Sequence, residues 1–115
     1  MDTLPPVLNP ARIQETTGGD PEFLRELMDL YLEDAQERLQ ELHAALEAAD
    51  AEAVARCAHK MKGASSNVGA ERIERLAIRI EQDAHRGVLP ALPETLSSLR
   101  SELERIPRAL EASTS

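Results

Sequence analysis

The apolar residues of this chain recur three and four positions apart over stretches that show no strand-like alternation. The longest stretch follows Asp20, Pro21 and Glu22, a typical helix start with an N-cap aspartate and a proline in the first turn. Such spacing puts the apolar side chains on one face and predicts a long amphipathic α-helix. That face would contain Leu24, Leu27, Tyr31, Ala35, Leu39, Leu42 and Leu46.

Start and stop signals divide the rest of the chain into further helices. Asn9-Pro10 opens a short helix that should end near the glycine pair 18–19. Asp50 can cap a helix that runs to Asn67, and Gly69 would separate it from a fourth helix. The buried face of the fourth helix would contain Ile73, Leu76, Ala77, Ile80 and Ala84, and that of the last helix Leu92, Leu96, Leu99, Leu103, Ile106 and Leu110.

These helices predict an all-α fold. Four principal helices with short connections favour an antiparallel four-helix bundle, preceded by the short extra N-terminal helix. The bundle should span residues 9–111, after an extended lead-in over 1–8 and before a frayed tail over 112–115. The 115 residues suffice for one hydrophobic core, and with one Tyr, one Phe and no Trp that core must be mainly aliphatic.

The composition narrows the possible partners. A formal net charge of −8 disfavours binding to the phosphate backbone of nucleic acids, and the scarcity of aromatic residues removes base-stacking platforms. The single cysteine, Cys57, cannot form an internal disulfide and favours a reducing compartment. Residues 1–10 show no signal-peptide pattern, and no apolar run is long enough for a membrane span. We therefore expect a cytoplasmic protein that binds neither nucleic acid nor a membrane.

The helix that follows Asp50 carries an unusual group of residues on one face. His59, Lys62 and Gly63 occupy positions i, i+3 and i+4 and therefore lie together. At about 100° of rotation per residue, the apolar residues of this helix lie opposite His59, which predicts that His59 faces solvent. The residues opposite are Val54, Cys57, Met61, Ala64, Ser65 and Val68, and those on the His59 side include Glu52, Ala55, Arg56, Ser66 and Ala70.

The three side chains suit a histidine that accepts a phosphoryl group. A neutral imidazole is a nucleophile near physiological pH, and Lys62 can offset the negative charge of a phosphorylated His59. A glycine inside a helix costs about 0.5–1 kcal/mol relative to alanine, so an exposed Gly63 is best explained by the close approach of another molecule. Surface histidines are nevertheless common, and His43 and His85 are expected to be ordinary ones.

The segment 58–70, AHKMKGASSNVGA, with its continuation 73–81, IERLAIRIE, resembles the signature of the histidine phosphotransfer (HPt) domain family. Met61 replaces the commoner leucine with similar volume. The resemblance implies that His59 is phosphorylated at Nε2, that Lys62 lies beside the phosphate and that Gly63 provides clearance. It also implies that Glu81 can accept a hydrogen bond from the other ring nitrogen of the histidine.

The resemblance implies partners as well. HPt domains exchange phosphoryl groups with an aspartate on the receiver domain of a response regulator or a hybrid sensor kinase. The Mg²⁺ for this exchange lies in the receiver, so the chain would be a carrier that needs no cofactor and no metal ligands of its own. The surface that contacts the receiver would include Ala55, Arg56, Ser66 and Ala70.

Other functions fit the sequence less well. No nucleotide-binding loop occurs, so the chain should not be a kinase, and no histidine has a glutamate three residues before it, as the metal-binding bundle enzymes require. A helical adaptor that binds receivers without transferring phosphate is the alternative to a phosphoryl carrier. A monomer is expected, because each apolar helix face is needed for the core.

Overall fold

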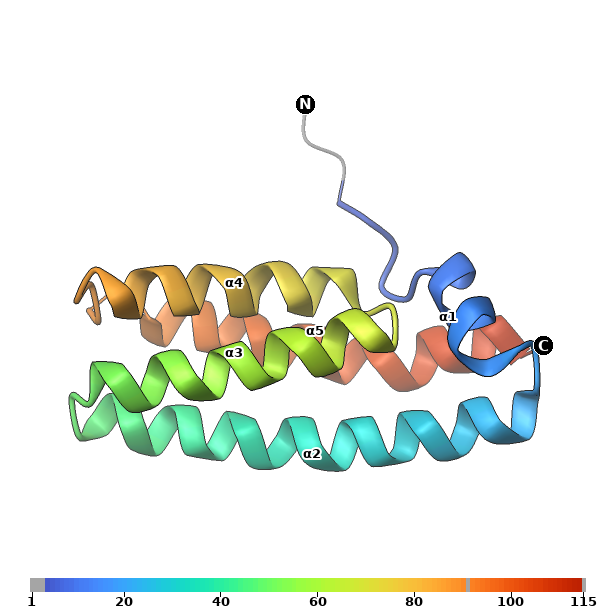
Figure 1. The fold of residues 1–115 in the computed structure, drawn as a ribbon, viewed down its shortest axis with the longest axis horizontal. Helices are drawn as coiled ribbons and strands as arrows, with labels where there is room; N and C mark the ends of the chain where they lie inside the picture. The colour runs from blue at the N-terminus through green and yellow to red at the C-terminus, as the bar shows by residue number, and fades with distance from the viewer. Residues whose placement is uncertain (1–3, 91, 115) are drawn as a thin grey trace.

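Residues 4–90 and 92–114, the part of the chain that the computed structural model describes, form five helices and no strand. Figure 1 shows four of them side by side and antiparallel, with the short first helix across one end. The helices are α1 (Pro10–Thr17), α2 (Pro21–Glu47), α3 (Ala51–Asn67), α4 (Glu71–His85) and α5 (Leu92–Thr114). The predicted antiparallel four-helix bundle with an extra N-terminal helix is confirmed. Within these residues no helix is both long and apolar enough to cross a membrane.

Side-chain caps fix where the first three helices begin. Asn9 and Asp20 each accept hydrogen bonds from two backbone N–H groups at the starts of α1 and α2. The Asp50 carboxylate accepts a bond from the Ala53 N–H at 3.0 Å at the start of α3. Each cap satisfies donors that have no partner inside the helix, so the local sequence determines these boundaries.

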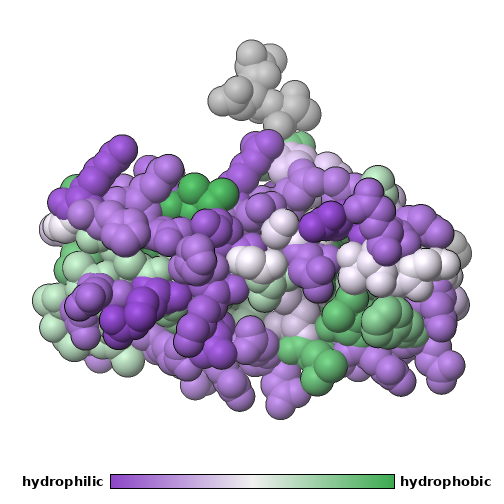
Figure 2. Space-filling view, in the orientation of Figure 1, coloured by the Kyte–Doolittle hydropathy of each residue, from purple (hydrophilic) through white to green (hydrophobic). Residues whose placement is uncertain are grey.

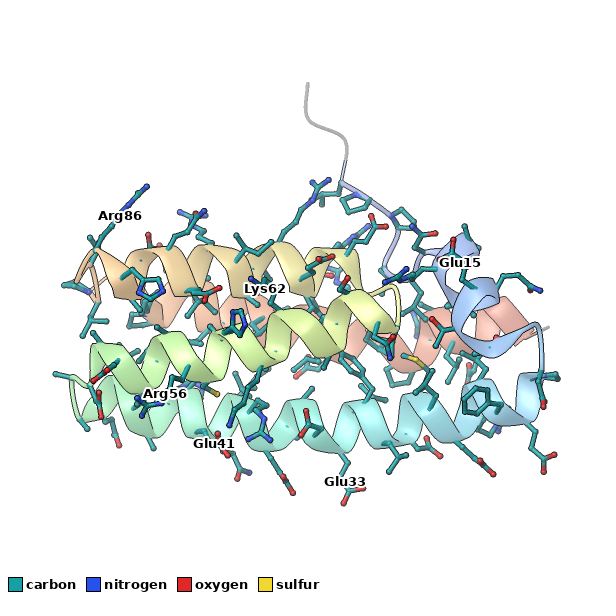
Figure 3. The ribbon with its side chains drawn as sticks, viewed as in Figure 1. Glu15, Glu33, Glu41, Arg56, Lys62 and Arg86 are labelled. Carbon is teal, nitrogen blue, oxygen red and sulfur yellow. The ribbon has the colours of Figure 1, made fainter. Side chains whose placement is uncertain are left out.

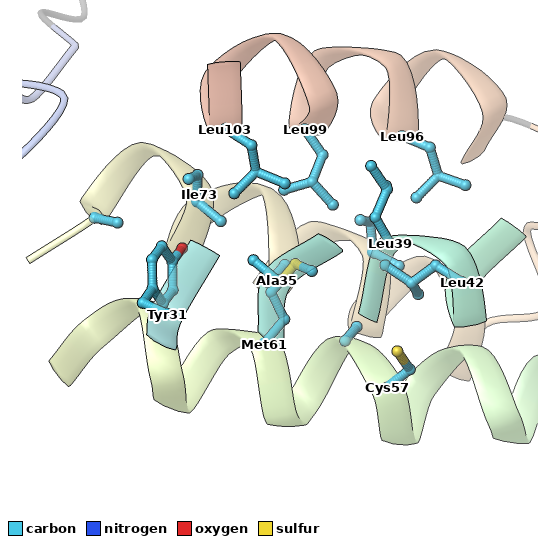
Figure 4. Packing of buried hydrophobic residues seen from close by; sticks show 14 of the residues in the cluster. Tyr31, Ala35, Leu39, Leu42, Cys57, Met61, Ile73, Leu96, Leu99 and Leu103 are labelled. Atoms are coloured by element: carbon cyan, nitrogen blue, oxygen red, sulfur yellow. The ribbon is translucent and has the colours of Figure 1, made fainter. Parts of the chain in front are cut away.

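The core between the four long helices is mainly aliphatic and includes a buried polar pair. Figure 4 shows side chains of α2, α3 and α5 converging, among them Leu39, Met61 and Leu99. The Tyr31 Oη and Ser65 Oγ atoms share a buried hydrogen bond of 2.8 Å that joins α2 to α3. Burial raises the pKa of Tyr31 to about 12, so the phenol stays protonated.

The N-terminal part of the chain forms hydrogen bonds with the C-terminal end of α3. The last carbonyl groups of a helix have no partners within it. Here the carbonyls at and just beyond the end of α3 accept hydrogen bonds from α1 and its cap. These bonds join Arg12 Nε to the Ser66 carbonyl at 3.1 Å, Thr16 Oγ1 to the Asn67 carbonyl at 2.9 Å and the Asn9 N–H to the Gly69 carbonyl at 2.8 Å.

The described residues at both ends of the chain lie against the bundle. Leu8 belongs to the core and Arg72 Nε donates to the Pro5 carbonyl at 2.7 Å, so the described part of the lead-in packs against the bundle. At the other end α5 continues into the predicted tail as far as Thr114. Its last turns lie beside α1, since Ala112 and Ile13 line the same hollow. Residues 1–3 and 115 lie outside the described residues.

The turn between α3 and α4 should tolerate no side chain at Gly69. This residue has φ +76°, and an added Cβ would lie 3.1 Å from the Asn9 carbonyl oxygen. We expect Gly69→Ala to lower the free energy of unfolding by about 1–3 kcal/mol, as measured by chemical denaturation. Gly87→Ala is the control, because Gly87 has φ +72° but open space around it. Equal losses in the two variants would contradict the close packing of Asn9 against the turn.

Candidate functional site

His59 lies in the middle of α3 and faces solvent. Its side chain is 64% exposed, whereas Val54, Cys57 and Met61 on the opposite face are buried. Ser65 and Val68 are buried as well, and Ala64 is half-buried. The predicted orientation of the helix is therefore confirmed, and it follows from the burial of the apolar face of α3.

The His59 ring is held through one nitrogen and open at the other. Nδ1 lies 3.0 Å from Glu81 Oε2 on α4, and a carboxylate can only accept, so in a neutral His59 this contact places the proton on Nδ1. Nε2 then carries the lone pair. Within the described residues Nε2 makes no hydrogen bond or ion pair. The ring is thus oriented with its nucleophilic nitrogen toward solvent.

Lys62 is held at the same carboxylate. Its Nζ lies 3.4 Å from Glu81 Oε1, and Figure 3 shows the side chain between α3 and α4. Burial alone would raise the pKa of Glu81, whose side chain is 18% exposed, but hydrogen bonds from His59 and Lys62 outweigh burial and lower that pKa. Glu81 is therefore ionised at neutral pH and holds a cation within one turn of His59.

Gly63 leaves an open surface one turn after His59. A Cβ built at this exposed position would meet no described atom within 4 Å beyond the adjacent residues and the backbone of α3 itself. Packing inside the protein therefore does not require a glycine here, although glycine weakens the helix.

A groove between α3 and α4 borders His59 on the side of the first turns of α3. Its volume is about 560 Å³, and His59, Glu81 and the predicted contact residues Ala55 and Arg56 line it. Ala55 is 6% exposed and lies at the floor, whereas Arg56 is exposed. We call this hollow the α3–α4 groove.

Two other predicted contact residues lie beyond Gly63. Ser66 is half-buried, and its carbonyl accepts the hydrogen bond from Arg12. Ala70 is fully buried, so the prediction that it belongs to the contact surface is wrong. The prediction extended a rotation of 100° per residue to position 70, but α3 ends at Asn67 and the chain turns at Gly69.

His85, which the sequence predicted to be an ordinary surface histidine, lies beside the site. Its Nε2 lies 3.8 Å from Glu81 Oε2, the oxygen that also contacts His59, and the residue lines the α3–α4 groove. The spacing of four between Glu81 and His85 was the available signal, because such residues are neighbours on a helix.

The one cysteine of the chain, Cys57, is a buried thiol. The Cys57 thiol donates to the Arg38 carbonyl, with Sγ and O 3.2 Å apart, and burial raises its pKa to about 11, so it stays protonated. Within the described residues no cluster of three or more His, Cys, Asp or Glu side chains could hold a metal ion.

Comparison with known proteins places this site in a family. The sequence profile of the Hpt domain matches residues 26–109, which is well over half of the chain and includes His59, Lys62, Gly63 and Glu81. The chain belongs to the Hpt domain family. Among solved structures, the histidine-containing phosphotransfer protein B (HptB) of Pseudomonas aeruginosa PAO1 is similar, with a TM-score of 0.81 and 33% identity over 95% of both chains.

Other Hpt proteins are more distant or longer. The phosphotransfer protein ZmHP2 from maize shares the fold, with a TM-score of 0.81 and 23% identity over 94% of this chain and 83% of that one. The phosphorelay intermediate protein rdeA of Dictyostelium discoideum is 31% identical over 88 residues, 76% of this chain and 35% of that protein. Histidine-containing phosphotransfer protein 2 of Arabidopsis thaliana is 31% identical over 67 residues, 56% of this chain and 43% of that protein. The chain spans less than half the length of these two curated relatives.

Removing the Lys62 ammonium should raise the pKa of Glu81. Lys62→Met deletes one hydrogen bond and one positive charge at the carboxylate, and an NMR titration of the carboxyl carbon would measure the change. Because the pKa of Glu81 is lowered in the folded protein, the stability that Lys62 adds should be fully present above the unfolded value of 4.5 and should be lost as the pH falls through the lowered pKa. Lys60→Met is the control, since Lys60 contacts no carboxylate in the described residues. An unchanged Glu81 titration in Lys62→Met would contradict this pairing.

Proposed function

We propose that this Hpt domain is a phosphoryl carrier in a two-component phosphorelay. His59 Nε2 would take a phosphoryl group from an aspartate of one receiver domain and pass it to another. The observation that carries this proposal is the held ring of His59, with Nδ1 bonded to Glu81 at 3.0 Å and a side chain that is 64% exposed.

The proposed step needs no proton transfer within the chain. The Nε2 lone pair attacks the phosphorus of the aspartyl phosphate, and the bond between phosphorus and the carboxyl oxygen breaks as the new bond forms. The receiver aspartate leaves as a carboxylate, and the phosphorylated His59 ring carries a positive charge with its proton still on Nδ1. The Glu81 carboxylate beside Nδ1 would stabilise this charge, and Lys62, which lies at the same carboxylate, would offset charge on the phosphoryl oxygens.

The partner would supply the rest of the chemistry. We expect receiver domains of response regulators or hybrid sensor kinases to provide the aspartate and the Mg²⁺ of the exchange, so the chain needs no cofactor. It would act as a monomeric carrier without kinase activity of its own, since its sequence has no nucleotide-binding loop.

An exposed apolar stripe supports binding to a protein partner. Phe23 and Leu30 on α2 are 44% and 66% exposed, and Leu27 lies between them on the same face. Figure 2 shows apolar side chains gathered over the N-terminal half of α2. We call these three residues the α2 stripe. It is also what a receiver-binding adaptor without transfer activity would need, so binding and transfer must be measured separately.

His59→Gln should abolish phosphoryl transfer and leave receiver binding intact. Receivers charged with acetyl phosphate would be mixed with each protein, and label on the chain and complex formation would be measured in parallel. Glutamine keeps a polar, exposed side chain but has no nucleophilic nitrogen. Loss of label with normal binding identifies the carrier. Equal labelling of the two proteins would refute the role of His59, and binding without label in the wild type would favour the adaptor.

Substitutions at Gly63 should separate helix stability from transfer. Gly63→Ala should raise the free energy of unfolding by about 0.5–1 kcal/mol, because glycine is unfavourable inside a helix and the new Cβ meets no other atom. Gly63→Gln should keep the fold but slow transfer, since its longer side chain would occupy the space that the receiver approaches. A stable Gly63→Gln protein with the wild-type rate would contradict the clearance role.

A further inference from the structure

Two imidazole rings approach one carboxylate oxygen at the site. Glu81 Oε2 lies 3.0 Å from His59 Nδ1 and 3.8 Å from His85 Nε2, so the two nitrogens lie within about 7 Å of each other. His85 follows Glu81 by one turn of α4 and is 66% exposed. The proposed transfer step uses His59 and Glu81 but gives His85 no role.

The shared oxygen couples the protonation of the two rings. A protonated His85 at 3.8 Å offsets part of the negative charge that Glu81 presents to His59, and two imidazolium charges at this distance repel each other. Both effects oppose a proton on His59 once His85 carries one. A protonated His59 has no lone pair on Nε2 and cannot accept a phosphoryl group.

We propose that His85 is a positioning residue of the phosphotransfer site: it shares the Glu81 carboxylate with His59, and whenever His85 carries a proton, its charge disfavours a proton on His59. This inference rests on the proposed function. As a consequence, phosphoryl transfer to His59 should continue to a lower pH than it would in a site that had Glu81 but no His85.

The other charged groups around His85 do not replace this pairing. Besides His59, the ionisable side chains of α3 that line the α3–α4 groove with His85 are Glu52, Arg56 and Lys60, and α4 contributes Glu81. Lys62 contacts the opposite oxygen of that carboxylate. Within the described residues Glu81 is the one carboxylate that pairs with either ring, and no side chain of α2 or α5 lines the groove.

The test is an NMR titration of the His59 ring in the intact protein and in two His85 variants. His85→Gln removes the second imidazole and should move the midpoint of the His59 titration up, by at most about 0.5 pH units, the size expected for two unit charges about 7 Å apart in water. His85→Lys keeps a cation next to Glu81 and should hold the midpoint at or below the wild-type value. His43→Gln, at an exposed position on α2, is the control and should leave it unchanged.

A second measurement follows transfer from a charged receiver between pH 5.5 and pH 8, with each protein's rate taken relative to its own rate at pH 8. The pH at which the relative transfer rate falls on acidification should be higher in His85→Gln than in the wild type. In His85→Lys it should be at or below the wild-type value. An unchanged or lowered His59 midpoint in His85→Gln would overturn the proposal. If the wild type accepts no phosphoryl group at any pH, the proposed function fails, whereas the NMR titration still decides whether the rings are coupled.

Discussion

The rotation of α3 about its own axis is the constraint on which the site depends. Val54 and Met61 are 1% exposed and are locked into the core, so the opposite side of the helix must face solvent. Turning the helix enough to hide His59 would expose these side chains, at about 1.5–3 kcal/mol for each large one. The exposure of the histidine is therefore enforced by ordinary hydrophobic packing rather than by any contact of the ring itself.

A second constraint sets how far α4 is shifted along the axis of α3, and so which of their residues lie opposite each other. At 1.5 Å per residue, His59 lies about 12 Å from the end of α3 and Glu81 about 15 Å from the start of α4. Side chains lean toward the N-terminus of their helix, so in this antiparallel pair the two side chains lean toward the same level. The turn at Gly69, anchored by Asn9, keeps this register. The cap of α1 thus supports the contact between His59 and Glu81, although neither residue touches α1.

Local signals in the sequence predicted much of this arrangement. Caps such as Asp50 and the spacing of apolar residues predicted the helices and the exposed face that carries His59, because both depend on neighbours within a few residues. Contacts between helices were less accessible. The family resemblance indicated Glu81, but the spacing from Glu81 to His85 has meaning only once Glu81 is known to face His59. The error at Ala70 has the same origin, since a helical rotation cannot be extended past a turn.

The two sides of His59 differ in a way that suits a transient partner. The Glu81 carboxylate contacts the His59 ring from the side of α4, and Lys62 contacts the same carboxylate there. Gly63 is rotated in the opposite direction from Lys62 about α3, toward α2. A receiver that approached over Gly63 and covered the α2 stripe would therefore reach Nε2 without displacing the carboxylate behind Nδ1. With the ring fixed on one side and the other side uncovered, the same histidine would meet each partner of the proposed relay in one orientation.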